Sequence, residues 1–300
     1  MTTNTKPAGF GAYWDAIDEE LVLYDAVPEL ELSHLRSTEF STTYNVRLTS
    51  IGPYRLFAYL SIPKGDGPFP ALLNMPRYGS VNNPPHYDDR QRYVVMTVMH
   101  RGQRLADKPY AAAYPGLLTD GIEDTATYIY RGILADCFRG AEYLLSRPEV
   151  QSQPAGTIGD DLAIITAARR PGFTALNVTG LMFYRMMEAA RRTEAYPLEE
   201  INEHIAYYHG SEPKVANTVS YFDPVHHAPS VKASVLINEG DPGSLGGTDF
   251  IDPLCSAFGG RVEPYLLTHE GGADHDANDA WMAQQLGVEA RPRLWAEAVA

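Results

Sequence analysis

The stretch Ala155-Gly156-Thr157-Ile158-Gly159-Asp160-Asp161-Leu162-Ala163 decides the fold of this chain. It opens with a short apolar run and passes through small and acidic residues into a helix-like run from Leu162 to Arg170. Aspartate is favoured at the start of a helix, so the two acids mark where the helix begins. The stretch therefore predicts a buried strand, a tight turn and a helix in direct succession.

The segments on either side extend this pattern over most of the chain. Continuous apolar runs, typical of parallel strands covered on both faces, occur at 71–75, 93–99 and 233–238, and a last strand is expected at 262–267. Residues 43–48 and 55–62 alternate like the strands of a hairpin, and helices are predicted at 130–145 and 277–286. Strands alternating with helices predict an α/β fold with a mostly parallel central sheet and helices on both faces.

No linker, repeat or low-complexity segment divides the chain, so we predict one domain over residues 1–300. Aromatic and aliphatic residues at helical spacing predict an N-terminal helical arm at about 10–25. A segment rich in aromatic, methionine and charged residues predicts a helical lid insertion at about 176–215.

Composition narrows the range of partners. The 300 residues carry a formal net charge of −14, which argues against binding to nucleic acid or to anionic membranes. Cys137 and Cys255 form no disulfide framework. The N-terminal residues lack the apolar core of a signal peptide, and no apolar run approaches the ~20 residues that span a bilayer. We expect a cytoplasmic protein that acts on a small molecule.

The turn at 159–163 resembles a nucleophile elbow in which the serine is replaced. The usual elbow reads G-x-S-x-G, whereas Gly159-x-Asp161-x-Ala163 places a carboxylate where a hydroxyl would attack. Two further residues follow in the order acid, then histidine. Asp241 lies in a glycine-rich turn after the 233–238 strand, and His269 lies just after the last strand. Glu239 and His275 are the weaker candidates for these two positions.

Several short motifs occur in an order that matches one family. They are Arg101-Gly102-Gln103, Arg147-Pro148-Glu149-Val150, Ser220-Tyr221-Phe222-Asp223 and His269-Glu270-Gly271-Gly272. Through them the chain, from Phe10 to about Leu286, resembles the acetyl xylan esterase / cephalosporin C deacetylase family of α/β hydrolases. The resemblance implies an α/β-hydrolase fold, a catalytic role for His269 and a possible homo-oligomer.

The same family carries G-G-S-Q-G-G at the elbow, and the register of this chain against it is open. Counting forward from Val150 places Asp161 at the serine position, whereas counting back from Pro171 places Thr157 there. Asp160 is the third alternative. The two acids could also serve only to cap the helix.

An oxyanion hole needs two backbone N–H groups. With Asp161 as the nucleophile, one comes from Leu162. The other is expected from Tyr78, which matches the tyrosine of the family's H-G-Y motif, although Pro76-Arg77 replaces the His-Gly pair. His226-His227 lacks a third ligand at suitable spacing, so we predict no metal and no cofactor.

These residues lead to a chemical hypothesis. A carboxylate attacks saturated carbon more usefully than a carbonyl, so Asp161 would open an epoxide-like ring or displace halide, forming an alkyl-enzyme ester. His269 would then activate the water that hydrolyses this ester. Acidic donors could come from four tyrosines of the lid, Tyr184, Tyr196, Tyr207 and Tyr208. The alternatives are a carboxylic ester hydrolase or deacetylase, a lyase or isomerase, and a catalytically inactive binding scaffold.

Overall fold

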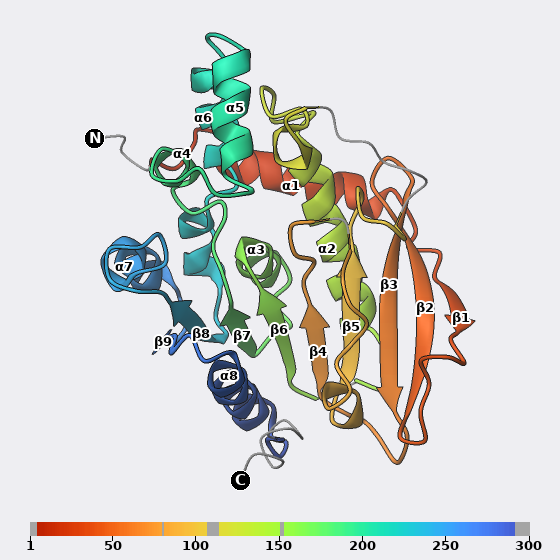
Figure 1. Ribbon diagram of the computed structural model, residues 1–300. Helices are drawn as coiled ribbons and strands as arrows, with labels where there is room; N and C mark the ends of the chain where they lie inside the picture. Colours follow the sequence, from red (N-terminus) through yellow and green to blue (C-terminus); the bar gives the residue numbers. More distant parts are fainter. Residues whose placement is uncertain (1–4, 80, 107–113, 151–152, 292–300) are drawn as a thin grey trace.

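The computed structural model describes residues 5–79, 81–106, 114–150 and 153–291. Within these residues the strands form one sheet in the order β1-β2-β3-β5-β4-β6-β7-β8-β9 (Figure 1). The strands are β1 (Glu29–Leu32), β2 (Ser41–Ser50), β3 (Tyr54–Pro63), β4 (Ala71–Asn74), β5 (Val94–Met99), β6 (Ala155–Gly159), β7 (Ala175–Val178), β8 (Ser234–Glu239) and β9 (Val262–Leu266). β1, β2, β3 and β5 pair antiparallel, while the pairs from β5 through β4 to β9 are all parallel.

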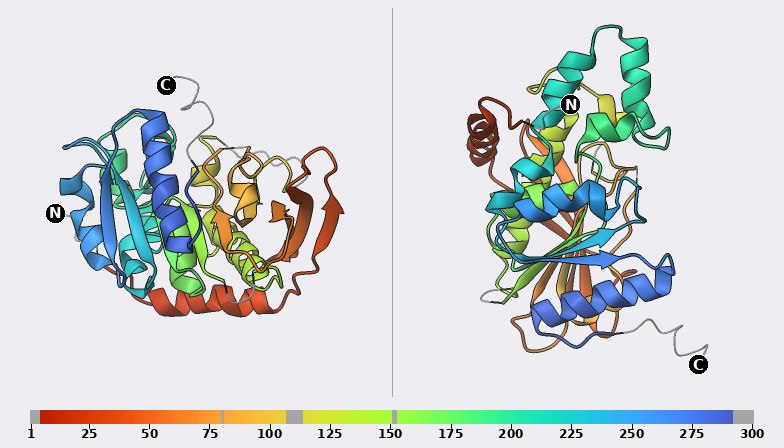
Figure 2. Two further views of the ribbon diagram at one scale, coloured as in Figure 1. Left: turned by 90° about the horizontal axis from the view of Figure 1, so that it is seen from below. Right: turned by 90° about the vertical axis from the view of Figure 1, so that its left-hand side faces the viewer.

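Helices cover both faces of the sheet. They are α1 (Phe10–Val22), α2 (Ile129–Leu145), α3 (Asp161–Arg169), α4 (Met186–Ala190), α5 (Glu199–Tyr207), α6 (Glu212–Ser220), α7 (Thr248–Ala257) and α8 (Gly271–Leu286). Short 3-10 helices are η1 (Asp89–Gln91), η2 (Leu117–Thr119), η3 (Pro224–His226) and η4 (Ala228–Ser230). Figure 2 shows α8 on the face opposite α1, and Figure 1 shows α4, α5 and α6 beyond the upper ends of β6 and β7. The predicted fold class is confirmed.

Two strands escaped the sequence analysis, and one of them moves a predicted boundary. The predicted insertion at 176–215 begins inside β7, because Ala175-Leu176-Asn177-Val178 is a strand and not part of a lid. Asn177 interrupts the apolar run and so hides the strand. The helical insertion instead lies between β7 and β8 and carries α4, α5 and α6. The other missed strand, β1, lies at the edge of the sheet with all four residues exposed.

Close packing fixes the turn that begins α3. A Cβ added at Gly159 would lie 2.6 Å from the Met75 Cβ, so only glycine allows the ends of β4 and β6 to approach this closely. Parallel strands end at a common edge, so the segments that follow β4, β6, β8 and β9 all emerge at one side of the sheet (Figure 1).

A buried ion pair joins this sheet to α2. Arg101, which follows β5, donates to both carboxylate oxygens of the fully buried Asp136, with Nη2–Oδ1 at 2.8 Å and Nε–Oδ2 at 3.0 Å. The backbone N–H of Arg101 also donates to Asp136 Oδ2 at 2.9 Å. The Arg-Gly-Gln motif therefore starts with a structural brace.

Among the described residues, no helix has the length and apolar character that crossing a bilayer requires.

Removing the carboxylate of Asp136 should destabilise the folded protein. Asp136→Ala leaves the Arg101 guanidinium largely buried without its counter-charge, and we expect a loss of about 3 to 5 kcal/mol in the free energy of unfolding. Glu29→Ala is the control, since it breaks the exposed pair with Arg55 and should cost no more than about 1 kcal/mol. Urea denaturation measures both values, and equal losses would contradict the brace.

Candidate active site

Asp160, and not Asp161, occupies the turn between β6 and α3. β6 ends at Gly159, α3 begins at Asp161, and Asp160 is the N-cap residue between them. Its Oδ1 accepts the backbone N–H of Leu162 at 2.9 Å. The backbone dihedrals of Asp160, φ −94° and ψ −148°, lie outside the left-handed region. The prediction that Asp161 stands at the turn is wrong, because the register is shifted by one residue.

Asp161 instead points into the protein. It is fully buried, and its Oδ2 accepts the backbone N–H groups of Met182 and Phe183, the latter at 3.0 Å. Its Oδ1 has no hydrogen-bond partner in the described part of the chain. Asp161 therefore ties the first turn of α3 to the segment that leads from β7 into the helical insertion, and this position gives it no route to a substrate.

The two adjacent carboxyl groups have raised pKa values for partly different reasons. Burial raises the pKa of Asp160 to about 6, although the Leu162 N–H and the charge of Arg77 oppose this rise. Burial raises the pKa of Asp161 too, and the neighbouring Asp160 charge adds to the effect against the two amide hydrogen bonds. Asp161 is therefore the carboxyl group of the two whose protonated form the fold favours more.

The other residues predicted at the elbow are engaged elsewhere. Thr157 is buried within β6, and its hydroxyl donates to the Leu73 carbonyl at 3.1 Å, so it belongs to the sheet. The Leu162 N–H is taken by Asp160, which leaves it unavailable as an oxyanion donor in this arrangement. With Asp160 at the turn, the N–H of the next residue is that of Asp161.

The structure brings the predicted acid and histidine together. His269 Nε2 lies 3.2 Å from Asp241 Oδ1, and both side chains are largely exposed. His269 has φ 63°, a left-handed conformation that is uncommon for a residue other than glycine. Asp274 holds the loop before it by accepting from the backbone N–H and the hydroxyl of Thr268, each at 2.8 Å. Within the described residues, no hydrogen bond joins His269 to Asp160 or Asp161.

The loop that carries Tyr78 is held by the last residue of the Arg-Gly-Gln motif. Gln103 Nε2 donates to the carbonyls of Arg77 and Gly79, at 2.9 and 3.0 Å. Gln103 Oε1 accepts from the side chain of Asn82 at 2.9 Å. The Arg77 carbonyl belongs to the same peptide group as the Tyr78 N–H, so holding it also holds the N–H that the oxyanion hole would use.

The Tyr78 side chain is held from the insertion. Its hydroxyl donates to Glu200 Oε1 of α5 at 2.5 Å, and Glu200 Oε2 accepts the Leu118 N–H at 3.0 Å. A Cβ at Gly116 would lie 2.2 Å from the Glu200 carboxylate, so the loop before η2 needs glycine there. This clamp, which the sequence did not predict, links the helical insertion to the loop of Tyr78.

The histidines and the tyrosines of the insertion are the other residues that the sequence analysis considered for a functional role. The described residues contain no group of three or more His, Cys, Asp or Glu side chains placed to hold a metal ion. His227 contacts the rings of Phe10 and Trp14, which is a packing role. Of the four tyrosines proposed as lid donors, Tyr184 is buried and bonds to the Phe250 carbonyl, while the others are exposed.

A turn between strand and helix, followed by an acid and a histidine after later strands of a mostly parallel sheet, defines an α/β hydrolase. The family model described as acetyl xylan esterase (AXE1) matches residues 1–242, so the chain belongs to the acetyl xylan esterase family. Esterases give this family its name.

Individual relatives agree with this assignment. The acetyl esterase Axe7A of Xylanibacter ruminicola is 23% identical over 252 residues, which is 78% of this chain but only 56% of that protein. The chain thus spans little more than half of that relative's length. Among solved structures, an acetyl xylan esterase from Paenibacillus sp. R4 aligns with a TM-score of 0.80 at 21% identity over 95% of this chain and 96% of that one. Acetyl xylan esterase 1 from Thermoanaerobacterium sp. JW/SL YS485 aligns with a TM-score of 0.77 at 20% identity, covering 95% and 94%. These likenesses show the fold.

The raised pKa of Asp161 should appear in the pH dependence of stability. Because the folded state favours the protonated form, this carboxyl group costs stability as pH rises from its unfolded value, about 3.9, toward its raised folded value. Asp161→Asn cannot ionise and can still accept the two N–H groups. Its Tm should match the wild type near pH 4.5 and exceed it at pH 8 by about 3 °C or more.

Differential scanning calorimetry at several pH values measures this effect. Asp66→Asn, in an exposed turn after β3, is the control and should leave the pH profile of the wild type unchanged. A gain for Asp161→Asn that is no larger at pH 8 than at pH 4.5 would show that Asp161 is ionised in the folded protein.

Proposed function

We propose that the protein hydrolyses carboxylic esters of the acetyl type, and that Asp160 acts as a general base on water where the family carries a serine. The observation that carries this proposal is the position of Asp160 in the turn between β6 and α3, where burial raises its pKa to about 6. The His269–Asp241 pair emerges at the same edge of the sheet. Membership of an esterase family supports the substrate class.

A carboxylate serves this chemistry better as a base than as a nucleophile. Attack of Asp160 on an ester carbonyl would give an acid anhydride, which reverts readily, whereas a water molecule held by Asp160 gives the stable acid product. Asp160 takes one proton from this water as its oxygen bonds to the carbonyl carbon. The electron pair of the carbonyl moves to its oxygen, which the backbone N–H groups of Tyr78 and Asp161 are proposed to stabilise.

The second half of the reaction needs a proton for the leaving alcohol. In the proposal, protonated His269 supplies it as the tetrahedral intermediate collapses, and Asp241 orients the imidazole and stabilises its cation. The proton on Asp160 then returns to His269 through solvent, which restores the starting state. The sum is ester plus water giving acid plus alcohol. Since His269 does not bond to Asp160 in the described residues, the proposal requires the exposed loops at 240–247 and 267–270 to close over the substrate.

The same carboxylate could attack saturated carbon, as in an epoxide hydrolase or a dehalogenase with an alkyl-enzyme intermediate. This reading keeps an aspartate nucleophile but transfers it from Asp161 to Asp160. The insertion's tyrosines give it little support, because Tyr184 is buried and bonded to a carbonyl. We therefore treat it as an alternative outcome of the labelling experiment below.

Replacing the base should abolish activity with a defined pH dependence. Asp160→Asn should lower kcat/KM for an acetyl ester by about 10²- to 10⁴-fold. Asp161→Asn should retain most activity, because it keeps the backbone N–H and changes only a side chain that points into the protein. A base works when deprotonated, so wild-type kcat/KM should rise with pH through about 6. Steady-state assays with 4-nitrophenyl acetate measure both effects. Full activity in Asp160→Asn, or no activity in the wild type, would overturn the proposal.

Isotope labelling separates the base from a nucleophile. During a single turnover of an acetyl ester in ¹⁸O-water, the base mechanism places the label in the released acetate and none in the peptide that contains Asp160. Label in that peptide, read by mass spectrometry, would establish covalent catalysis instead. We expect no turnover of epoxides or alkyl halides under the same conditions, and labelling of Asp160 with those substrates would favour the alkyl-enzyme reading.

A further inference from the structure

A cavity of about 700 Å³ lies against the face of the sheet that α8 covers. Its walls come from the loop after β4, from η1, from the sheet and from α8. Tyr78 and Gly159 border its upper end, while Asp160, Asp161 and His269 are not among the described residues that line it. The cavity is therefore a neighbour of the candidate active site that can be considered separately.

The floor of this cavity is polar where a sheet face is normally apolar. Thr97 of β5 pairs with Asn74 of β4, Asn74 pairs with Ile158 of β6, and Ile158 pairs with Asn177 of β7, so these residues lie at one level across four strands. All four line the cavity. Two residues earlier along the strands the same face is apolar, and Leu72, Val95 and Ala175 there belong to one cluster with Trp281 and Met282 of α8.

Several of the polar atoms have no partner. Asn177 is 2% exposed and Tyr93 is 1% exposed, and both line the cavity. The Asn177 Nδ2 donates to Asn278 of α8 at 2.7 Å, but its Oδ1 accepts nothing from the described residues, and neither the Tyr93 hydroxyl nor Asn238 Oδ1 has a partner there. Unpaired buried polar groups cost stability, so such a set in one cavity indicates a ligand that completes their hydrogen bonds.

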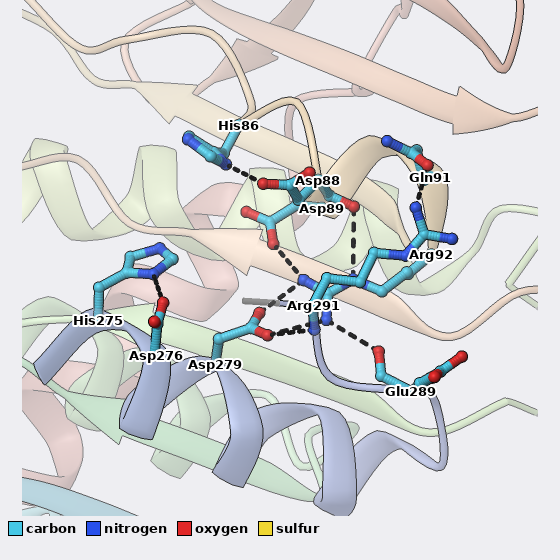
Figure 3. Close-up of polar contacts among 10 residues, drawn as sticks. All are labelled: His86, Asp88, Asp89, Gln91, Arg92, His275, Asp276, Asp279, Glu289 and Arg291. Atoms are coloured by element: carbon cyan, nitrogen blue, oxygen red, sulfur yellow. Dashed lines mark hydrogen bonds and ion pairs between the residues drawn. The ribbon is translucent and has the colours of Figure 1, made fainter. Parts of the chain in front are cut away.

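The charged residues of the walls are already matched. Figure 3 shows Arg92 between Asp89 and Asp279, with Nη2–Oδ1 distances of 3.1 and 2.5 Å. Asp274 accepts from Thr268 and from the Tyr265 hydroxyl, the latter at 2.9 Å. Arg77 also lines the cavity, at the end that borders Gly159, and its charge lowers the pKa of Asp160. The floor itself, formed by Thr97, Asn74, Ile158 and Asn177, carries no charged side chain, so a neutral ligand is favoured there.

We propose that this cavity is a binding site for a neutral small molecule that carries several hydroxyl or amide groups. In the free protein the unpaired oxygen atoms of Asn177, Asn238 and Tyr93 expose almost no surface, so the proposal has these three side chains turn toward the ligand when it binds. The ligand's donors then bond to Asn177 Oδ1 and Asn238 Oδ1, and the Tyr93 hydroxyl donates to one of its acceptors. The rings of His86 and His275, with centroids 5.8 Å apart, come from opposite walls, namely the loop after β4 and α8 (Figure 3). The cavity shares Tyr78 with the proposed oxyanion hole, whereas none of the residues assigned to proton transfer lines it.

A matched ligand series tests the proposal directly. D-gluconamide supplies neutral hydroxyl and amide groups, gluconate is its anionic counterpart and N-methylglucamine a cationic one. Saturation-transfer NMR and isothermal titration calorimetry should show millimolar or tighter binding of gluconamide, and at least about tenfold weaker binding of both charged compounds. No saturable binding of gluconamide, or equal binding of a charged counterpart, would overturn the proposal.

Variants locate the binding. Tyr93→Phe and Asn177→Ala should each weaken gluconamide binding about fivefold or more, because each removes a hydrogen bond to the ligand. Asn45→Ala is the control, since Asn45 lies on β2 and also has an unpaired Oδ1, but away from the cavity. Tyr93→Phe removes an unpaired buried hydroxyl, so the free protein should unfold at the same or a higher temperature, and a folding defect cannot mimic lost binding. Binding unaffected by both variants would place the ligand elsewhere.

Discussion

Two adjacent carboxyl groups stand at the start of α3, and desolvation of this turn raises the pKa of both. The structure separates them by giving them different surroundings. Asp161 points inward to the N–H groups of Met182 and Phe183 and so fixes the start of the insertion to the helix. Asp160 remains at the turn with its charge. Everything proposed for the active site depends on this division, because a protonated Asp160 could not accept a proton from water.

The geometry of the turn suits a general base at Asp160 better than a nucleophile. The elbow of the family surrounds its serine with glycines, whereas Ile158 and Leu162 stand two residues before and after Asp160. Asp160 does not adopt a left-handed conformation, and its side chain caps the helix by accepting the Leu162 N–H. A base needs only reach a water molecule. The loop of Tyr78, held by Gln103, retains the rigidity that stabilising an oxyanion demands.

The sequence predicted those features that depend on order along the chain. Alternating strands and helices predicted the fold class, and the order of acid and histidine predicted the contact of Asp241 with His269. A one-residue register could not be decided from the sequence, because both Asp160 and Asp161 suit a helix start and only packing shows which one is buried. The strand β7 was missed because Asn177 breaks its apolar run. The cavity could not be predicted either, since its polar residues come from separate strands that pairing alone brings to one level.

The ionisation of the two carboxyl groups is the claim on which the account turns, and carboxyl ¹³C NMR of aspartate-labelled protein measures it directly. With Asp160→Asn and Asp161→Asn to assign the resonances, the wild type should show Asp160 titrating near pH 6 while Asp161 stays protonated through neutral pH. If both resonances titrate together below pH 5, the turn holds two carboxyl groups with ordinary pKa values. The assignment of different roles to Asp160 and Asp161 would then be wrong.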